Sequence, residues 1–183
     1  MTLSLAVQFV SKAKHLPDRA QVRRWGLAAH AKNSQAVVTI RYVDEQEGRA
    51  LNLAFRQKDY ATNVLTFVHD SVPSPGGGGL GRGKSAKRSS SSLRRATYPH
   101  PNPPPLGEGA LYGADIVICA PVIAREAREQ KKLVAAHHGH MVIHGMLHAQ
   151  GFDHEVEADA TAMEATEIAL LRRFRIKNPY EIK

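Results

Sequence analysis

The chain has a single cysteine and no apolar run that approaches 18 residues. One cysteine excludes a disulfide within the chain and leaves any metal site to histidine. Cys119 stands in an apolar run, so we expect it to be a small buried hydrophobe. The lack of a long apolar run argues against a membrane span, and the amino terminus shows no basic-then-apolar leader. These absences predict a cytoplasmic protein without membrane contact.

Acidic residues are scarce relative to basic ones. The 183 residues hold 25 Lys and Arg against 17 Asp and Glu, a formal charge of +8. A basic balance favours polyanionic partners, above all nucleic acid. The length suits one catalytic domain over residues 1–183, large enough to bury a real core.

Periodicity predicts an α+β fold, a small mixed sheet packed with helices. The expected strands cover residues 3–10, 36–43, 63–68 and 114–119. The expected helices run from Pro17 to about 32, from a capping box at Asp44 through Phe55, from Pro121 through His148, and over about 155–174.

One segment, at about residues 70–109, interrupts this pattern. It contains four consecutive glycines, four consecutive serines and a proline-rich stretch, with almost no apolar residues between them. Such a composition cannot bury enough surface to offset its ordering entropy, so we expect one long disordered insert between two strands. The insert could be neutral, shield a cleft, or bind RNA through its basic residues.

The most informative segment lies between residues 144 and 154, where three histidines are spaced by four and six residues. On a helix, His144 and His148 share one face, roughly 6 Å apart along the axis. Gly151 could end that helix in the left-handed conformation, so that His154 returns from the loop. Three neutral imidazoles with one open position are typical of catalytic zinc. The spacing therefore predicts one zinc ion on His144, His148 and His154, carried by a zincin-like helix.

His140 is a rival ligand because it also lies four residues from His144. The set of residues 140, 144 and 148 would span about 12 Å of straight helix, which is poor geometry for one tetrahedral ion. We therefore expect His140, together with His137 and His138, either at the surface or behind the ligands.

The histidine spacing matches the HExxHxxGxxH pattern of metzincin peptidases with one change. Gly145 stands where those enzymes have the glutamate that takes a proton from the metal-bound water. The site is thus similar to a zincin in geometry but lacks its base. Asp153, beside His154, could orient a ligand, cap a turn or carry a proton.

Three ordered blocks resemble the YbeY family of bacterial rRNA-maturation endoribonucleases. The histidine segment has the form HGxLHxxGxDH, residues 51–67 are similar to the family's LNxxxRxKDxPTNVLSF block, and residues 113–121 are similar to its LGDIVIC block. The resemblance covers about residues 1–68 and 110–175. Ala61 replaces the usual proline of the second block and Thr66 the usual serine.

The resemblance implies a metal-dependent α+β fold with zinc on the three motif histidines. It also implies single-strand-specific endoribonuclease activity in 3′-end maturation of small-subunit rRNA and in ribosome quality control. The implied partners are RNA, the small ribosomal subunit and assembly proteins. By position, Arg56 matches the family's arginine that acts on the phosphate, which suits its planar, permanently charged fork. Lys58 is a further RNA-contact candidate.

Two other functions stay open from the sequence. Metzincin-like spacing alone would suit a zinc peptidase. A ribosome-assembly factor with a mainly structural metal would also fit the blocks and the charge. A peptidase and a ribonuclease differ in the substrate they cleave. An assembly factor would be indicated if a metal-ligand variant unfolded and the folded parent protein showed no turnover.

Overall fold

The computed structural model describes residues 2–32, 34–69, 111–152 and 157–181. The elements follow one another as β1 (Thr2–Phe9), α1 (Arg19–Ala29), β2 (Gln35–Val43), α2 (Glu45–Arg56), β3 (Val64–Val68), β4 (Leu111–Cys119), α3 (Ala120–Glu129), α4 (Val134–Ala149) and α5 (Glu157–Arg172). The α+β class with a small mixed sheet is confirmed.

The sheet has the strand order β1-β2-β4-β3. The first three strands are parallel, and β3 pairs antiparallel to β4 at the edge, with Thr66 opposite Ile116. β-branched residues predominate in β2 and form the run Ile116–Ile118 of β4, and such side chains pack well on a pleated surface. Both strands are largely buried.

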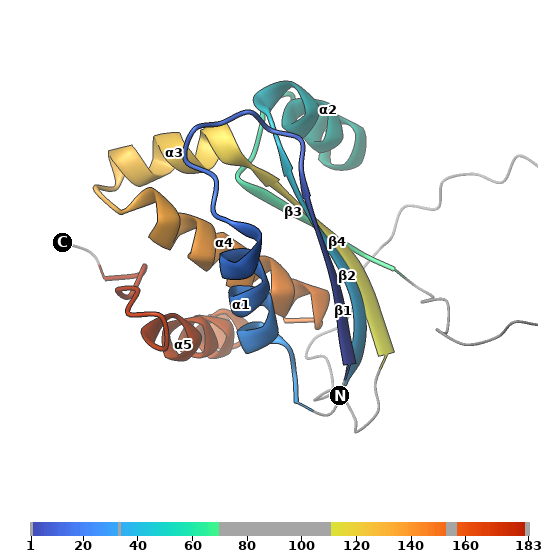
Figure 1. Cartoon of the computed structure of the whole chain (residues 1–183), viewed down its shortest axis with the longest axis vertical. Helices are drawn as coiled ribbons and strands as arrows, with labels where there is room; N and C mark the ends of the chain where they lie inside the picture. Colours follow the sequence, from blue (N-terminus) through green and yellow to red (C-terminus); the bar gives the residue numbers. More distant parts are fainter. Residues whose placement is uncertain (1, 33, 70–110, 153–156, 182–183) are drawn as a thin grey trace, which may run out of the picture.

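The helices lie on both faces of the sheet. α1 and α4 cover one face, α5 packs against α4 on that same side, and α2 lies on the other face (Figure 1). The larger core joins the first group to the sheet through residues such as Trp25, Ile116 and Ile143. A smaller core around Leu65, Val117 and the buried Cys119 lies on the α2 side. The predicted burial of Cys119 is therefore confirmed.

The predicted long helix from Pro121 to His148 is wrong, because two helices occupy that stretch. α3 ends at Glu129, and Lys131 takes a positive φ of 53° before α4 begins. The Lys132 Nζ donates to the carbonyl of Pro179, which fixes this connection to the end of the chain. The break lets α4 turn and cross the sheet face independently of α3.

The predicted capping box at Asp44 is also wrong. Asp44 is the N-cap of α2, but its side chain makes no cap hydrogen bond. It accepts instead from the hydroxyl of Ser11, 33 residues earlier. A long-range partner has replaced the local one, and a complete capping box is present at Asp18 of α1 instead.

The predicted insert at about 70–109 lies outside the described residues. In the described ranges, no helix is both long and apolar enough to span a bilayer.

Candidate metal centre

Helix α4 approaches the sheet closely at Gly145. A Cβ built on this residue would lie 2.7 Å from Cγ2 of Ile116 and 3.3 Å from Oγ1 of Thr66. The first distance is shorter than van der Waals contact allows, so a side chain here would require Ile116 or α4 to shift. The glutamate of the zinc peptidases is thus missing from this position, and the packing also leaves no space for it.

The end of α4 is a sharp reversal. Gly151 has φ 87°, and Phe152 N–H donates to the carbonyl of Leu147 at 3.1 Å. This six-to-one bond is characteristic of a Schellman motif, for which glycine is favoured. The turn predicted at Gly151 is confirmed.

Gln150 anchors this reversal to α1. Its amide nitrogen donates to the carbonyls of Ala29 and Met146, and its oxygen accepts from the N–H of Ala31. The side chain is buried and uses both ends of its amide. The last turn of α4, which carries His148, is therefore held in place from outside the helix.

His144 and His148 face each other on this last stretch of α4. Their Nε2 atoms lie 3.1 Å apart, and the ring centroids are 4.5 Å apart. Two nitrogens bound at 2.0–2.1 Å to one tetrahedral ion would be separated by about 3.3 Å. The pair therefore has nearly the spacing that one zinc ion requires. Both histidines are partly exposed.

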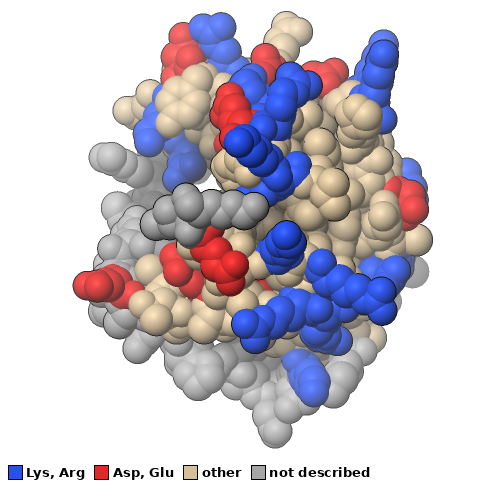
Figure 2. All heavy atoms as spheres, turned by 90° about the vertical axis from the view of Figure 1, so that its left-hand side faces the viewer, with Lys and Arg blue, Asp and Glu red and all other residues tan. Residues whose placement is uncertain are grey.

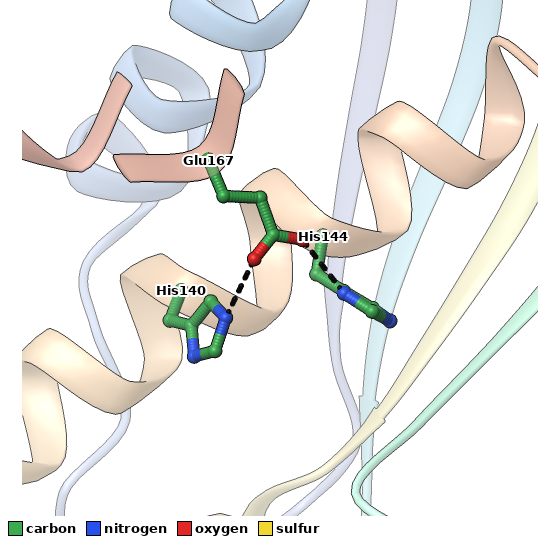
Figure 3. A group of neighbouring side chains, drawn as sticks. All are labelled: His140, His144 and Glu167. Carbon is green, nitrogen blue, oxygen red and sulfur yellow. Dashed lines mark hydrogen bonds and ion pairs between the residues drawn. The ribbon is translucent and has the colours of Figure 1, made fainter. Parts of the chain in front are cut away.

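A buried carboxylate stands behind this pair. Glu167 of α5 is 0% exposed, and its Oε1 lies 2.8 Å from Nδ1 of His144 (Figure 3). Its Oε2 lies 2.9 Å from Nε2 of His140 and also accepts from the hydroxyl of Tyr180. Burial alone would raise the pKa of Glu167, but the hydrogen bonds from His140 and His144 lower it to about 2.

The ligand atoms of His140, His144 and Glu167 lie within 4.8 Å of one another, so this cluster could hold a metal ion. Figure 3 shows both rings pointing at the carboxylate from successive turns of α4. Two arrangements are thus open. In one, Glu167 is a ligand; in the other, it supports His144 from behind while the ion lies on the His148 side.

His137 and His138 are buried, with 4% and 1% of their surface exposed, so the surface alternative was wrong for both. Nε2 of His137 lies 2.8 Å from a carboxylate oxygen of Glu126, which also accepts from Asn63. The ring of His138 packs edge-on against Tyr42 at 5.4 Å. These two histidines belong to the core.

Arg56 and Lys58 lie near the end of α2, with exposed side chains. The neighbouring Phe55 packs on Phe67 at 4.8 Å, on the sheet face that α2 covers. These contacts leave the guanidinium and the ammonium groups at the surface. Their roles stay predictions.

Asp153 and His154, the remaining predicted site residues, lie outside the described residues. The described chain reaches the reversal at Gly151 and Phe152 and resumes in α5 at Glu157.

Sequence reasoning missed Glu167, the partner of His144. It lies 23 residues from His144 and, in the sequence, is one of several acidic residues in the last helix. One signal was available. A glutamate three residues before Leu170 and four before Leu171 falls on the apolar face of that helix, where a charge requires a partner.

Comparison with known proteins identifies the family of the chain. The family model described as Endoribonuclease YbeY matches residues 11–175. The chain belongs to the YbeY family. An Endoribonuclease YbeY from Thiobacillus denitrificans is 44% identical over 178 residues, covering 97% of this chain and 96% of its own length. One from Polaromonas sp. is 41% identical over 177 residues, covering 94% and 89%.

A solution structure of a Thermotoga maritima protein aligns at 18% identity with a TM-score of 0.47, over 97% of this chain and 99% of that one. YbeY membership rests on the sequence matches, and it places the chain among endoribonucleases.

Proposed function

We propose that this protein is a zinc-dependent endoribonuclease specific for single-stranded RNA. It acts in 3′-end maturation of small-subunit rRNA and in ribosome quality control, in the cytoplasm. Its partners are RNA, the small ribosomal subunit and assembly proteins. The observation that carries the proposal is the 3.1 Å separation of the two Nε2 atoms of His144 and His148, in a chain of the YbeY family.

His144, His148 and His154 would hold the ion. When bound, a three-histidine zinc polarises a phosphoryl oxygen and lowers the pKa of water towards neutrality. The partial exposure of His144, 21% of its side chain, supports an accessible catalytic site over a closed structural one. It therefore also disfavours an assembly factor with a purely structural metal.

Arg56 is proposed to bind the phosphate. Its guanidinium keeps its charge throughout the neutral range and presents parallel N–H donors to two phosphate oxygens. N–H donors directed at the phosphate oxygens stabilise the extra negative charge of the transition state. Lys58, two residues later and exposed, would contact the RNA backbone nearby.

The surface charge supports a polyanionic substrate. Lys and Arg side chains gather in broad patches on the face shown in Figure 2. An open cavity of about 520 Å³ between α1, the start of α4 and the residues after α5 is lined by Arg24, Arg173 and Arg175 among others. Phosphate backbones bind such basic surfaces without regard to sequence.

The peptidase alternative loses its support at Gly145. Peptide cleavage by a zincin requires a glutamate at this position. Gly145 has no side chain to act as that base, and a Cβ built here would lie 2.7 Å from Cγ2 of Ile116.

The test is cleavage of a 3′-extended small-subunit rRNA fragment by the zinc-loaded protein, read on a denaturing gel with and without chelator. A fully base-paired version of the same fragment is the matched substrate control. We expect cleavage of the single-stranded extension that chelator abolishes. Intact RNA, with zinc measured on the protein, would overturn the nuclease proposal and favour an assembly role.

A further inference from the structure

We infer that Glu167 is the positioning residue of the metal centre: it fixes His144 with its proton on Nδ1, so that Nε2 offers its lone pair to the ion. The inference rests on the proposed function in one respect, that His144 binds the metal. It assigns to α5 a role in the site that the histidine motif does not contain.

The first step is the donor count at the carboxylate. An ionised carboxylate only accepts hydrogen bonds. Glu167 has three partners, namely Nε2 of His140, Nδ1 of His144 and the hydroxyl of Tyr180. With no exposed surface, the carboxylate has these groups in place of water. Each of the three therefore donates, and His144 carries its proton on Nδ1.

The second step follows from imidazole chemistry. A neutral ring with its proton on Nδ1 has a lone pair on Nε2, and a metal binds that atom. Nε2 of His144 is the atom that faces His148, 3.1 Å away. Glu167 thus binds the protonated nitrogen of the ring, and the nitrogen with the lone pair faces His148. A carboxylate behind a ligand histidine is a recurrent arrangement that orients the ring and raises its basicity.

The third step separates this arrangement from one in which Glu167 is itself a ligand. Its oxygens lie 2.8 and 2.9 Å from the two histidine nitrogens. These are ordinary hydrogen-bond lengths, as is the 3.1 Å between the Nε2 atoms of His144 and His148, but they fall further short of the about 3.3 Å between two ligands of one tetrahedral zinc ion. An ion between them would also replace the protons that hold the cluster together.

The remaining partners make Glu167 a rigid support. Tyr180 comes from beyond α5, and its ring packs edge-on against His140 at 5.8 Å. Lys132 holds the adjacent Pro179 through its carbonyl. The residues after α5 are therefore tied both to the start of α4 and to the carboxylate that orients His144.

The most direct experiment needs no variant. ¹⁵N NMR of the zinc-free protein reports which imidazole nitrogen of His144 is protonated. We expect the proton on Nδ1. Protonation on Nε2 would overturn the inference, whether or not the protein later proves to cleave RNA.

Variants measure the energetic consequence. Glu167→Gln keeps the shape but offers one acceptor oxygen to three donors, and we expect zinc affinity in chelator competition to fall roughly 10- to 100-fold. Glu164→Gln is the matched control: the same change one turn earlier on α5, at a partly exposed position, with zinc affinity within about twofold of the parent. Equal affinity for the Glu167 variant and the parent would contradict the inference.

Two further variants keep the test decisive. If Glu167→Gln does not fold, Tyr180→Phe removes one of the three donors without touching a histidine. We expect it to leave the zinc stoichiometry at one and to change the affinity by only a few-fold. A ligand role for Glu167 would instead show as retention of zinc in His148→Ala together with its complete loss in Glu167→Gln.

Discussion

The two halves of α4 use histidine in opposite ways. In the first half, His137 and His138 are buried and belong to contacts with Glu126 and Tyr42. In the second half, His144 and His148 are partly exposed and turn their Nε2 atoms toward each other. The residue type is the same in both halves, but the neighbours differ: the first pair contacts groups of the protein interior, and the second pair lies one helical turn apart at the surface. A histidine whose polar atoms are directed into the core supports structure, and a pair that converges at an accessible surface can bind metal.

The largest predicted effects come from one variant in each half of α4. His148→Ala should lower zinc affinity more than about 100-fold and abolish RNA cleavage, since it removes a ligand itself rather than its support. Its melting temperature without zinc should stay near that of the parent. His137→Ala should leave zinc affinity unchanged and lower the free energy of unfolding, because Glu126 loses a part-buried charge-assisted hydrogen bond worth about 2 kcal/mol.

Zinc titration and thermal unfolding of both variants test this prediction. His15→Ala, at an exposed position, is the neutral control. Loss of zinc binding in the His137 variant at unchanged stability would contradict the division of α4 into a structural half and a metal-binding half.

The next effect concerns acid stability. Burial, and then the charge of His137, lower the pKa of His138 from 6.5 to about 4. Between pH 6.5 and about 4, His138 is therefore protonated in the unfolded chain but not in the folded chain. The free energy of unfolding should fall by up to about 3 kcal/mol as the pH drops from 6.5 to about 4.

His138→Phe keeps an aromatic ring against Tyr42 and removes the titrating group. Denaturant unfolding across this pH range should give a flatter profile for the variant than for the parent. An unchanged slope would place the acid sensitivity elsewhere.

The smallest predicted effect is at Gly145. Gly145→Ala should cost about 1–2 kcal/mol, because the clash with Ile116 exceeds the gain in helix propensity. Gly48→Ala in α2 is the matched control. Its new Cβ would lie 3.3 Å from Sγ of Cys119, and it should be neutral or slightly stabilising in the same chemical denaturation.

The sequence predicted the elements well where local chemistry decides them. Strand positions followed from β-branched runs, and the reversal after α4 followed from Gly151. The break between α3 and α4 was missed because Lys131, with its positive φ, is neither glycine nor asparagine. The break is closed locally by the N–H of Lys132, which donates to the carbonyl of Ala127, and from outside by the contact of Lys132 Nζ with the carbonyl of Pro179.

The site was predictable only in part, for the same reason. The spacing of His144 and His148 is local, and the structure brings their nitrogens together. The burial of His137 depends on Glu126 and Asn63 in other elements, and the partner of His144 lies on another helix. No pattern within one helix can specify partners contributed by distant segments.

The closure of α4 has a consequence for synthesis of the protein. Gln150 joins the end of α4 to Ala29, 121 residues earlier in the sequence. Glu167, the partner of His144, comes 23 residues later in the sequence than His144. A nascent chain that has emerged only through the histidine motif lacks the carboxylate that orients His144. The support that Glu167 gives to His144 is therefore gained only after α5 has packed against α4.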